Sequence, residues 1–184
     1  MSMRIFAFVA AILLCGAQAR AEEANSIAVV DIQKIVAESS ATKEINKQLE
    51  KKKNEFQSSI NKQEEGLVKE DQELAKQKAS LSPAAFEQKS KDFKNKVATV
   101  QRDVQKKRAQ LENAYTDALS KVQKNVLEII KGMASEKHFT LAVPASQTLY
   151  FEKNMDISEE VLEALNKKLP KVDVEIKEIK EPKK

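Results

Sequence analysis

The sequence predicts an α+β fold in which a long antiparallel α-helical hairpin projects from a small β-barrel-type oligomerisation head. Charged residues make up 33% of the chain and aromatic residues 5%, with no Trp and three Gly. This composition is typical of long helices rather than of a large globular core. Short β-branched runs stand near both ends of the chain, and a Ser-Pro pair interrupts the helical region between them. We therefore expect the two ends to form the head and the middle to form the hairpin.

The first 21 residues have the features of a cleavable secretory signal peptide. Arg4 supplies a positive charge, residues 5–15 form an apolar run, and residues 19–21 form a small-x-small cleavage site. The apolar run is shorter than the roughly twenty residues that span a bilayer core. We expect cleavage after Ala21 and export of the mature chain.

Export also limits the chemistry of the mature chain. Its only cysteine, Cys15, lies in the segment to be removed, so no thiol, disulfide or thiolate metal site is expected. Lipidation at Cys15 is an alternative, but Leu14 stands where a lipoprotein signal has a small residue. Without Arg4 and Arg20 the chain has 30 basic and 28 acidic residues, a net charge of +2 instead of +4. This near balance argues against nucleic acid as the main partner.

The head begins with a predicted strand. Residues 26–32 form a short run rich in Val and Ile, which is typical of a buried strand, and a brief helix is expected at residues 33–39. We assign residues 22–41 and 135–169 to the head, and residues 42–134 to the helical arm.

The first helix of the arm has a seam that is only half apolar. One heptad position is apolar throughout, at Ile60, Leu67, Leu74 and Leu81. The other position is occupied by Leu49, Phe56, Gln63, Glu70 and Gln77. A coiled-coil seam needs both positions apolar, so the distal half should pack weakly. Gly66 adds a cost of about 1 kcal/mol relative to Ala.

A reversal of the chain is predicted near residues 81–84. Ser82 can cap a helix that has Pro83 at its first position. The return helix carries an apolar stripe that is denser toward its C-terminal end, at Phe93, Val97, Val100, Val104, Leu111, Tyr115, Leu119, Val122, Val126, Ile129, Ile130 and Met133. Forty to fifty helical residues give arms of roughly 60–75 Å, most of whose surface must face water.

The C-terminal part of the head is predicted as a hairpin and a short helix. Phe139, Leu141 and Val143 alternate with smaller or polar residues, residues 144–147 form a turn, and residues 148–151 form a second strand. Residues 156–160 have the caps and acids of a helix start. The tail, residues 170–184, alternates like an edge strand but ends in charge and Pro, and we expect it to be disordered.

Such a head is too small to stand alone. Three short strands and one helix are near the minimum for independent stability and leave strand edges open. With no disulfide or metal available, oligomerisation is the remaining means of stabilisation. We assign to the head interface Ile27, Val29, Val30, Phe139, Leu141, Val143, Leu149 and Phe151. The alternative is that they form the core of a single chain, and in a closed barrel they would do both.

The two ends of the chain resemble a known family. The segments "SIAVVDIQKIVAES" and "KHFTLAVPASQTLYFEKNMDISEEVLEALNKKL" are similar to those of the Skp/OmpH periplasmic chaperones, over residues 27–169. The resemblance implies a periplasmic homotrimer with a central β-barrel. It also implies arms that hold unfolded outer-membrane proteins in a cavity. We expect this holding to be independent of ATP. The tail after Leu169 is longer than is usual in the family.

The arm carries candidate contacts for such clients. They are Leu81, Phe86 and Phe93 near the tip, and the basic residues Lys51, Lys52, Lys53, Lys106, Lys107 and Arg108. The apolar three would equally serve to hold the tip together. Each basic run, taken alone, reads as solvated helix surface, but in a trimer the potentials of three arms would add. Weak contact with an anionic membrane surface or lipopolysaccharide is a further candidate interaction.

No enzyme is predicted. His138 is the only histidine and has no catalytic partner at a recognisable spacing, so we interpret it as structural. There is no phosphate-binding loop or metal-ligand motif in the sequence, and no cofactor is expected. Two other functions remain as alternatives: a periplasmic coiled-coil adaptor, which would need a continuous apolar seam, and a basic nucleic-acid-binding protein.

Overall fold

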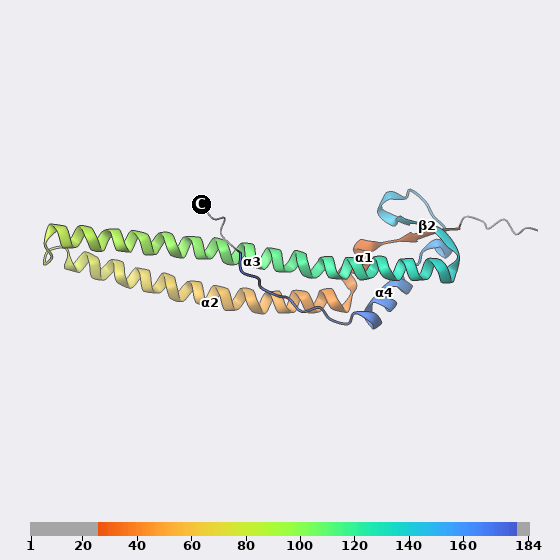
Figure 1. The fold of residues 1–184 in the computed structure, drawn as a ribbon, viewed down its shortest axis with the longest axis horizontal. Helices are drawn as coiled ribbons and strands as arrows, with labels where there is room; N and C mark the ends of the chain where they lie inside the picture. The colour runs from red at the N-terminus through yellow and green to blue at the C-terminus, as the bar shows by residue number, and fades with distance from the viewer. Residues whose placement is uncertain (1–25, 180–184) are drawn as a thin grey trace, which may run out of the picture.

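Two long helices lie side by side and carry a small α+β head at one end (Figure 1). The computed structural model describes residues 26–179, and the predicted signal peptide lies outside this range. In chain order the elements are β1 (Ser26–Val30), α1 (Ile32–Glu38), α2 (Ser40–Gln77), α3 (Pro83–Lys137), β2 (Phe139–Pro144), the short 3-10 helices η1 (Ala145–Gln147) and η2 (Lys153–Met155), and α4 (Ser158–Lys168).

Local capping determines where the long helices begin. The Ser39 side chain accepts a hydrogen bond from the backbone N–H of Thr42 at the start of α2. The Ser82 hydroxyl accepts one from the backbone N–H of Ala85, and Pro83 is the first residue of α3. The Ser82 cap and the restricted backbone angle of Pro83 together fix the residue at which α3 begins. The 55 residues of α3 correspond to a helix of about 80 Å.

The apolar core lies in the head and in the adjoining part of the arm. Fully buried side chains come from four helices, and they include Ile35, Ile45, Val122, Val126, Val161 and Leu165. Within the described chain, no residue between positions 46 and 113 is buried. The distal arm therefore lacks a dry core, as expected from its half-polar seam.

The head is a layer of short elements around this core. Asn166 of α4 accepts hydrogen bonds from the backbone N–H and the hydroxyl of Ser40, at 2.8 and 2.9 Å. Lys34 of α1 pairs with Glu159 of α4, and this hydrogen bond raises the pKa of the Lys34 ammonium. These contacts join α4 to the beginning of the chain.

The sheet contains two strands, which run parallel. β1 pairs with β2 in the register Ala28 to Ala142 and Val29 to Val143. Parallel strands need a long crossover connection, and here the whole pair of long helices serves as that connection. The pairing confirms that the two ends of the chain meet in one sheet.

The predicted second strand at residues 148–151 is wrong for this chain. The chain leaves β2 through η1 and then runs without regular structure, with Leu149 and Tyr150 at 107% and 81% exposure. Its β-branched and aromatic composition favours a strand, but no neighbouring strand of the same chain takes up its hydrogen bonds. The expected three-stranded sheet is therefore a two-stranded one, with one additional bridge between Val29 and Asp156.

The tail does not show the expected disorder over residues 170–179. It runs back from α4 along the long helices (Figure 1), and Val172 and Val174 are buried in the apolar core. Residues 180–184 lie outside the described range. The alternating Val residues pack against an apolar surface of the helices, which the sequence of the tail alone could not show.

Among the described helices, none combines the length and apolar character needed to cross a membrane.

Candidate functional site: the distal arm and the exposed face of the head

The distal arm is held together by polar side chains that bridge α2 and α3. The bridging pairs are Gln77 with Lys89 at 2.6 Å, Glu70 with Lys96 at 2.6 Å, and Ser59 with Lys107 at 3.1 Å. The α3 partner moves forward in sequence as the α2 partner moves back, so the two helices run in opposite directions. The predicted polar seam positions Glu70 and Gln77 thus lie between the helices.

These bridges contribute little to stability. The Lys96 and Glu70 side chains are 58% and 38% exposed, and ion pairs at such exposure are worth about 0–1 kcal/mol. The side-chain oxygen Oε1 of Gln63 is buried without a hydrogen-bond partner. A buried acceptor left without a partner costs about 1–3 kcal/mol. The distal seam is therefore loosely held, because its polar positions offset rather than reinforce the packing of its apolar ones.

A groove of about 410 Å³ opens beside this seam. Its lining combines apolar and charged side chains: Glu70, Glu73, Leu74, Gln77, Lys89, Asp92, Phe93 and Lys96. Phe93, a predicted client contact, thus lies among charges of both signs. Leu81 and Phe86 are half-buried at the tip of the arm. Such a surface can make short-lived apolar contacts while remaining well hydrated.

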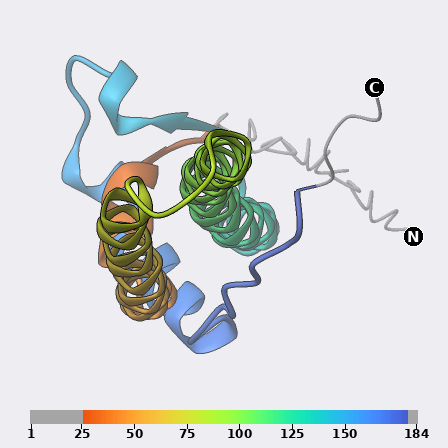
Figure 2. The same ribbon diagram turned by 90° about the vertical axis from the view of Figure 1, so that its left-hand side faces the viewer.

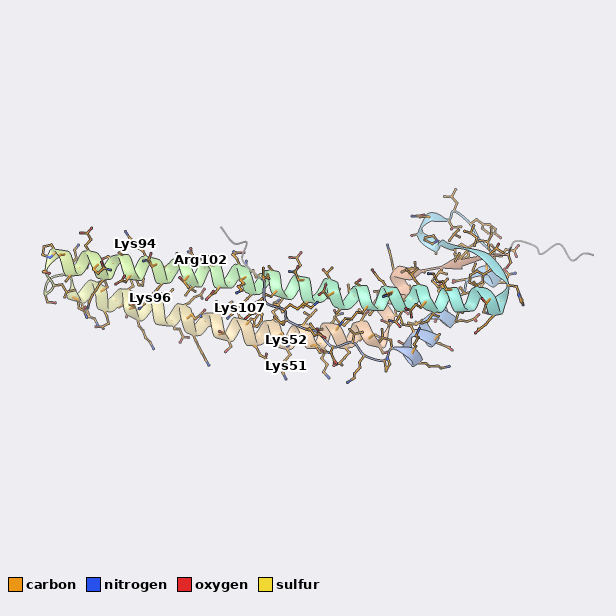
Figure 3. The ribbon with its side chains drawn as sticks, in the orientation of Figure 1. Lys51, Lys52, Lys94, Lys96, Arg102 and Lys107 are labelled. Atoms are coloured by element: carbon orange, nitrogen blue, oxygen red, sulfur yellow. The ribbon has the colours of Figure 1, made fainter. Side chains whose placement is uncertain are left out.

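The basic residues are spread along the arm rather than gathered at one point. Figure 3 shows Lys94 and Lys96 toward the tip, with Lys51 and Lys52 nearer the head. The ammonium of Lys107 lies 5.5 Å from the centre of the Phe56 ring. The predicted runs are therefore not uniform: Lys51, Lys53 and Arg108 are exposed, whereas Lys52, Lys106 and Lys107 are half-buried.

The predicted interface residues of the head fall into two groups. Val29, Val30 and Phe139 are buried within the chain, so for them the core interpretation holds. Ile27 and Leu141 are 40% and 50% exposed and belong to neighbouring positions of the two strands. Val143 and Phe151 are half-buried.

The exposed apolar surface of the head includes one residue that the sequence did not indicate, Tyr150. Leu149 and Tyr150 both project from the segment after η1 and are almost fully exposed. Tyr150 was missed because alternation along a strand placed it on the opposite face from Leu149. Apolar side chains exposed together in this way are typical of surfaces covered by a partner.

His138 has a structural position. It adopts a left-handed backbone conformation, with φ 57° and ψ 33°, and ends α3 as its C-cap. Its carbonyl oxygen accepts a hydrogen bond from the Ser26 hydroxyl at 2.9 Å. This conformation stops the helix and directs the chain into β2. In the part of the chain that the structure describes, no cluster of three or more His, Cys, Asp or Glu could hold a metal ion.

Comparisons with known proteins match most of this chain. The family model described as outer membrane protein (OmpH-like) matches residues 26–165. A crystal structure of a candidate outer membrane chaperone (OmpH-like) from Caulobacter crescentus CB15 has a TM-score of 0.77 at 18% sequence identity. The alignment covers 84% of this chain and 91% of that chain. At this identity the likeness shows a shared fold. No curated protein matches the chain in sequence.

Proposed function

The chain belongs to the OmpH-like family of outer membrane proteins, which confirms the resemblance seen in its two ends. On this premise we propose that it is a periplasmic holdase chaperone. It binds unfolded outer-membrane β-barrel proteins in a cavity between helical arms and prevents their aggregation without ATP. The observation that carries the proposal is the distal arm, in which no described residue between 46 and 113 is buried. No catalytic step is part of this function.

The loosely held seam supports a holding mechanism. Helices joined by exposed polar pairs and half-buried apolar residues can bend and separate at low cost. Arms of this kind can accept clients of different size, and many weak contacts hold an unfolded chain. Since no single contact is strong, release requires no chemical step. A structural adaptor would need a continuous apolar seam, and the polar bridges at Glu70 and Gln77 argue against it.

The exposed head supports a homotrimer. A two-stranded sheet is too small to be stable by itself and leaves strand edges unpaired. Three copies that close around Ile27, Leu141, Leu149 and Tyr150 would cover this exposed apolar surface. Three arms would then surround one space, and their basic residues would contribute to a common potential. This potential would favour acidic client segments and weak contact with an anionic membrane surface or lipopolysaccharide.

The first test is on the assembly. We expect sedimentation of the purified mature chain to give three times the mass of one chain. The double variant Leu149→Lys, Tyr150→Lys places two charges on the apolar surface and should sediment as a monomer. Val68 is 57% exposed on α2, so Val68→Lys is a matched control that should stay trimeric. A wild-type monomer would contradict the proposal.

The second test is on holding. A urea-denatured porin diluted into buffer should aggregate more slowly with the wild-type chain, without ATP, than in buffer alone. The Leu149→Lys, Tyr150→Lys variant should lose most of this effect, because separate arms enclose no cavity. Unchanged aggregation in the presence of a folded wild-type trimer would refute the holdase function.

A further inference from the structure

The tail forms a defined strap on the long helices. We use "strap" for residues 170–179, which follow α4 and extend along α2 and α3 (Figure 1). Figure 2 shows the strap on the side of the helix pair opposite β2. Val172 and Val174 are buried, whereas Asp173 and Glu175 are exposed. The strap therefore presents the alternating pattern of an extended segment with one apolar edge.

One side chain of α2 recognises the backbone of the strap. The Gln48 amide nitrogen Nε2 donates a hydrogen bond to the carbonyl of Val172 at 3.0 Å. Its oxygen Oε1 accepts one from the backbone N–H of Val174 at 2.9 Å. Any extended segment offers a carbonyl and an N–H at this spacing, so these two bonds select a conformation rather than a sequence.

The surface beneath the strap is apolar and partly built from small residues. Ala114 and Ala118 of α3 are buried, and they belong to the same apolar cluster as Val172 and Val174. Toward the end of the strap, its residues and α3 together line a pocket of about 340 Å³ that includes Ala114 and Asp117. The surface of α2 and α3 under the strap, which we call the groove at Gln48, thus combines buried apolar side chains with an amide that binds backbone.

The remaining contacts of the strap are exposed, and two of them depend on its own charged side chains. Lys177 pairs with Asp117 at 2.7 Å, and Glu175 lies 3.8 Å from Lys121. The Gln110 amide donates to the carbonyl of Lys177 at 3.1 Å. Exposed ion pairs of this kind are weakened by salt and add little to affinity. The strap is therefore held mainly by features that another extended chain could also use.

We propose that the groove at Gln48 is a binding site for extended polypeptide segments with alternating apolar side chains, and that the strap is its displaceable built-in occupant. This inference rests on the proposed function and names the kind of client segment that the site takes. Strands of transmembrane β-barrels alternate apolar and polar residues with the same period of two. An unfolded outer-membrane protein thus carries many segments able to replace the strap, while the tethered strap competes from a high local concentration.

The test measures peptide binding to the full mature chain. The probe is a fluorescein-labelled peptide with the sequence of residues 170–179, PKVDVEIKEI. The strap-released variant, Val172→Asp with Val174→Asp, frees the groove and should bind the probe at least about tenfold more tightly than the wild type. Asp173→Asn alters only an exposed strap residue and should bind like the wild type. A scrambled probe without alternation should bind weakly to every variant.

The role of Gln48 is tested in the strap-released background. Adding Gln48→Leu keeps the volume but removes both backbone hydrogen bonds, and should reduce probe binding about tenfold or more. Circular dichroism checks that the helices are intact. If this variant does not fold, hydrogen exchange in the wild type replaces it: the Val174 N–H should exchange slowly and should be exposed when the probe is added. Equal binding by wild type and strap-released variant, or an unprotected Val174 N–H, overturns the inference.

The two proposals fail in different ways. If the wild-type chain delays porin aggregation but its strap-released variant gains no affinity for the probe, the holdase function stands and the groove is not a client site. If the probe binds as expected but aggregation is not delayed, the groove stands as a peptide site and the holdase function falls. If client segments bind where the strap binds, unfolded porin should compete with the probe for the groove of the strap-released variant.

Discussion

Replacing Gln63 with Leu should stabilise the arm. Gln63 occupies the seam of α2, and its Oε1 is buried without a hydrogen-bond partner. Removing a buried acceptor that lacks a partner relieves about 1–3 kcal/mol. Leu has nearly the same volume as Gln and extends the apolar heptad position of Leu49 and Phe56. Since about 1 kcal/mol shifts Tm by roughly 2–4 °C at this chain length, we expect an increase in Tm of about 2–12 °C.

The assay is thermal unfolding followed by helical circular dichroism, at one fixed chain concentration because the stability of an oligomer depends on concentration. Gln72→Leu changes an exposed residue of the same helix and should stay within about 0.5 kcal/mol of the wild type. A stiffer seam should also slow the capture of large clients. An unchanged or lower Tm for Gln63→Leu would show that the Gln63 amide finds a hydrogen-bond partner in solution. It would refute the interpretation that this buried polar group destabilises the seam.

Three further outcomes follow from particular contacts. Ile35 is fully buried, so Ile35→Ala should cost about 2–5 kcal/mol in urea unfolding. Lys107→Ala removes the Ser59 hydrogen bond and the contact with an aromatic ring, and should cost no more than about 1–2 kcal/mol. The hydrogen bond between Asp117 and Lys177 lowers the pKa of the carboxyl and raises that of the ammonium. The contribution of this ion pair to strap attachment is therefore complete between the ordinary pKa values of the two groups. It is lost in acid as pH falls through the lowered pKa of Asp117, and in alkali as pH rises through the raised pKa of Lys177. Wild-type affinity for the strap peptide should therefore be constant from pH 5 to pH 9, because strap attachment does not change there.

The helical part of the molecule could be predicted because local signals determine it. Ser82 and Pro83 place the start of α3 through a cap and a fixed backbone angle. The polar heptad positions, Gln63 among them, indicated a weak distal seam, and no described residue from 46 to 113 is buried. Such features depend on residues a few positions apart, so the sequence contains them directly.

The segments that were misjudged depend on distant partners. Residues 148–151 have strand composition but no strand beside them in this chain. The tail alternates like an edge strand, yet its order comes from Gln48, more than 120 residues earlier. Nothing near the tail in sequence marks that amide. The client contacts and the head interface stay predictions, and how their residues divide between core and exposed surface follows from the packing of both chain ends.

The position of the strap links its occupancy to the flexibility of the arm. Gln48 and Ala114, which flank the strap, stand at the boundary where buried residues give way to the open seam. With the strap in place, Val172 and Val174 extend the apolar core at this boundary. Without an occupant, the parts of α2 and α3 at this boundary lose their apolar cover, and the loosely held region of the arm extends toward the head. A client segment that replaces the strap would restore the cover. In the proposed function, client binding and arm stiffness would therefore be coupled through the same few side chains, and any ligand that prefers one state would shift the other.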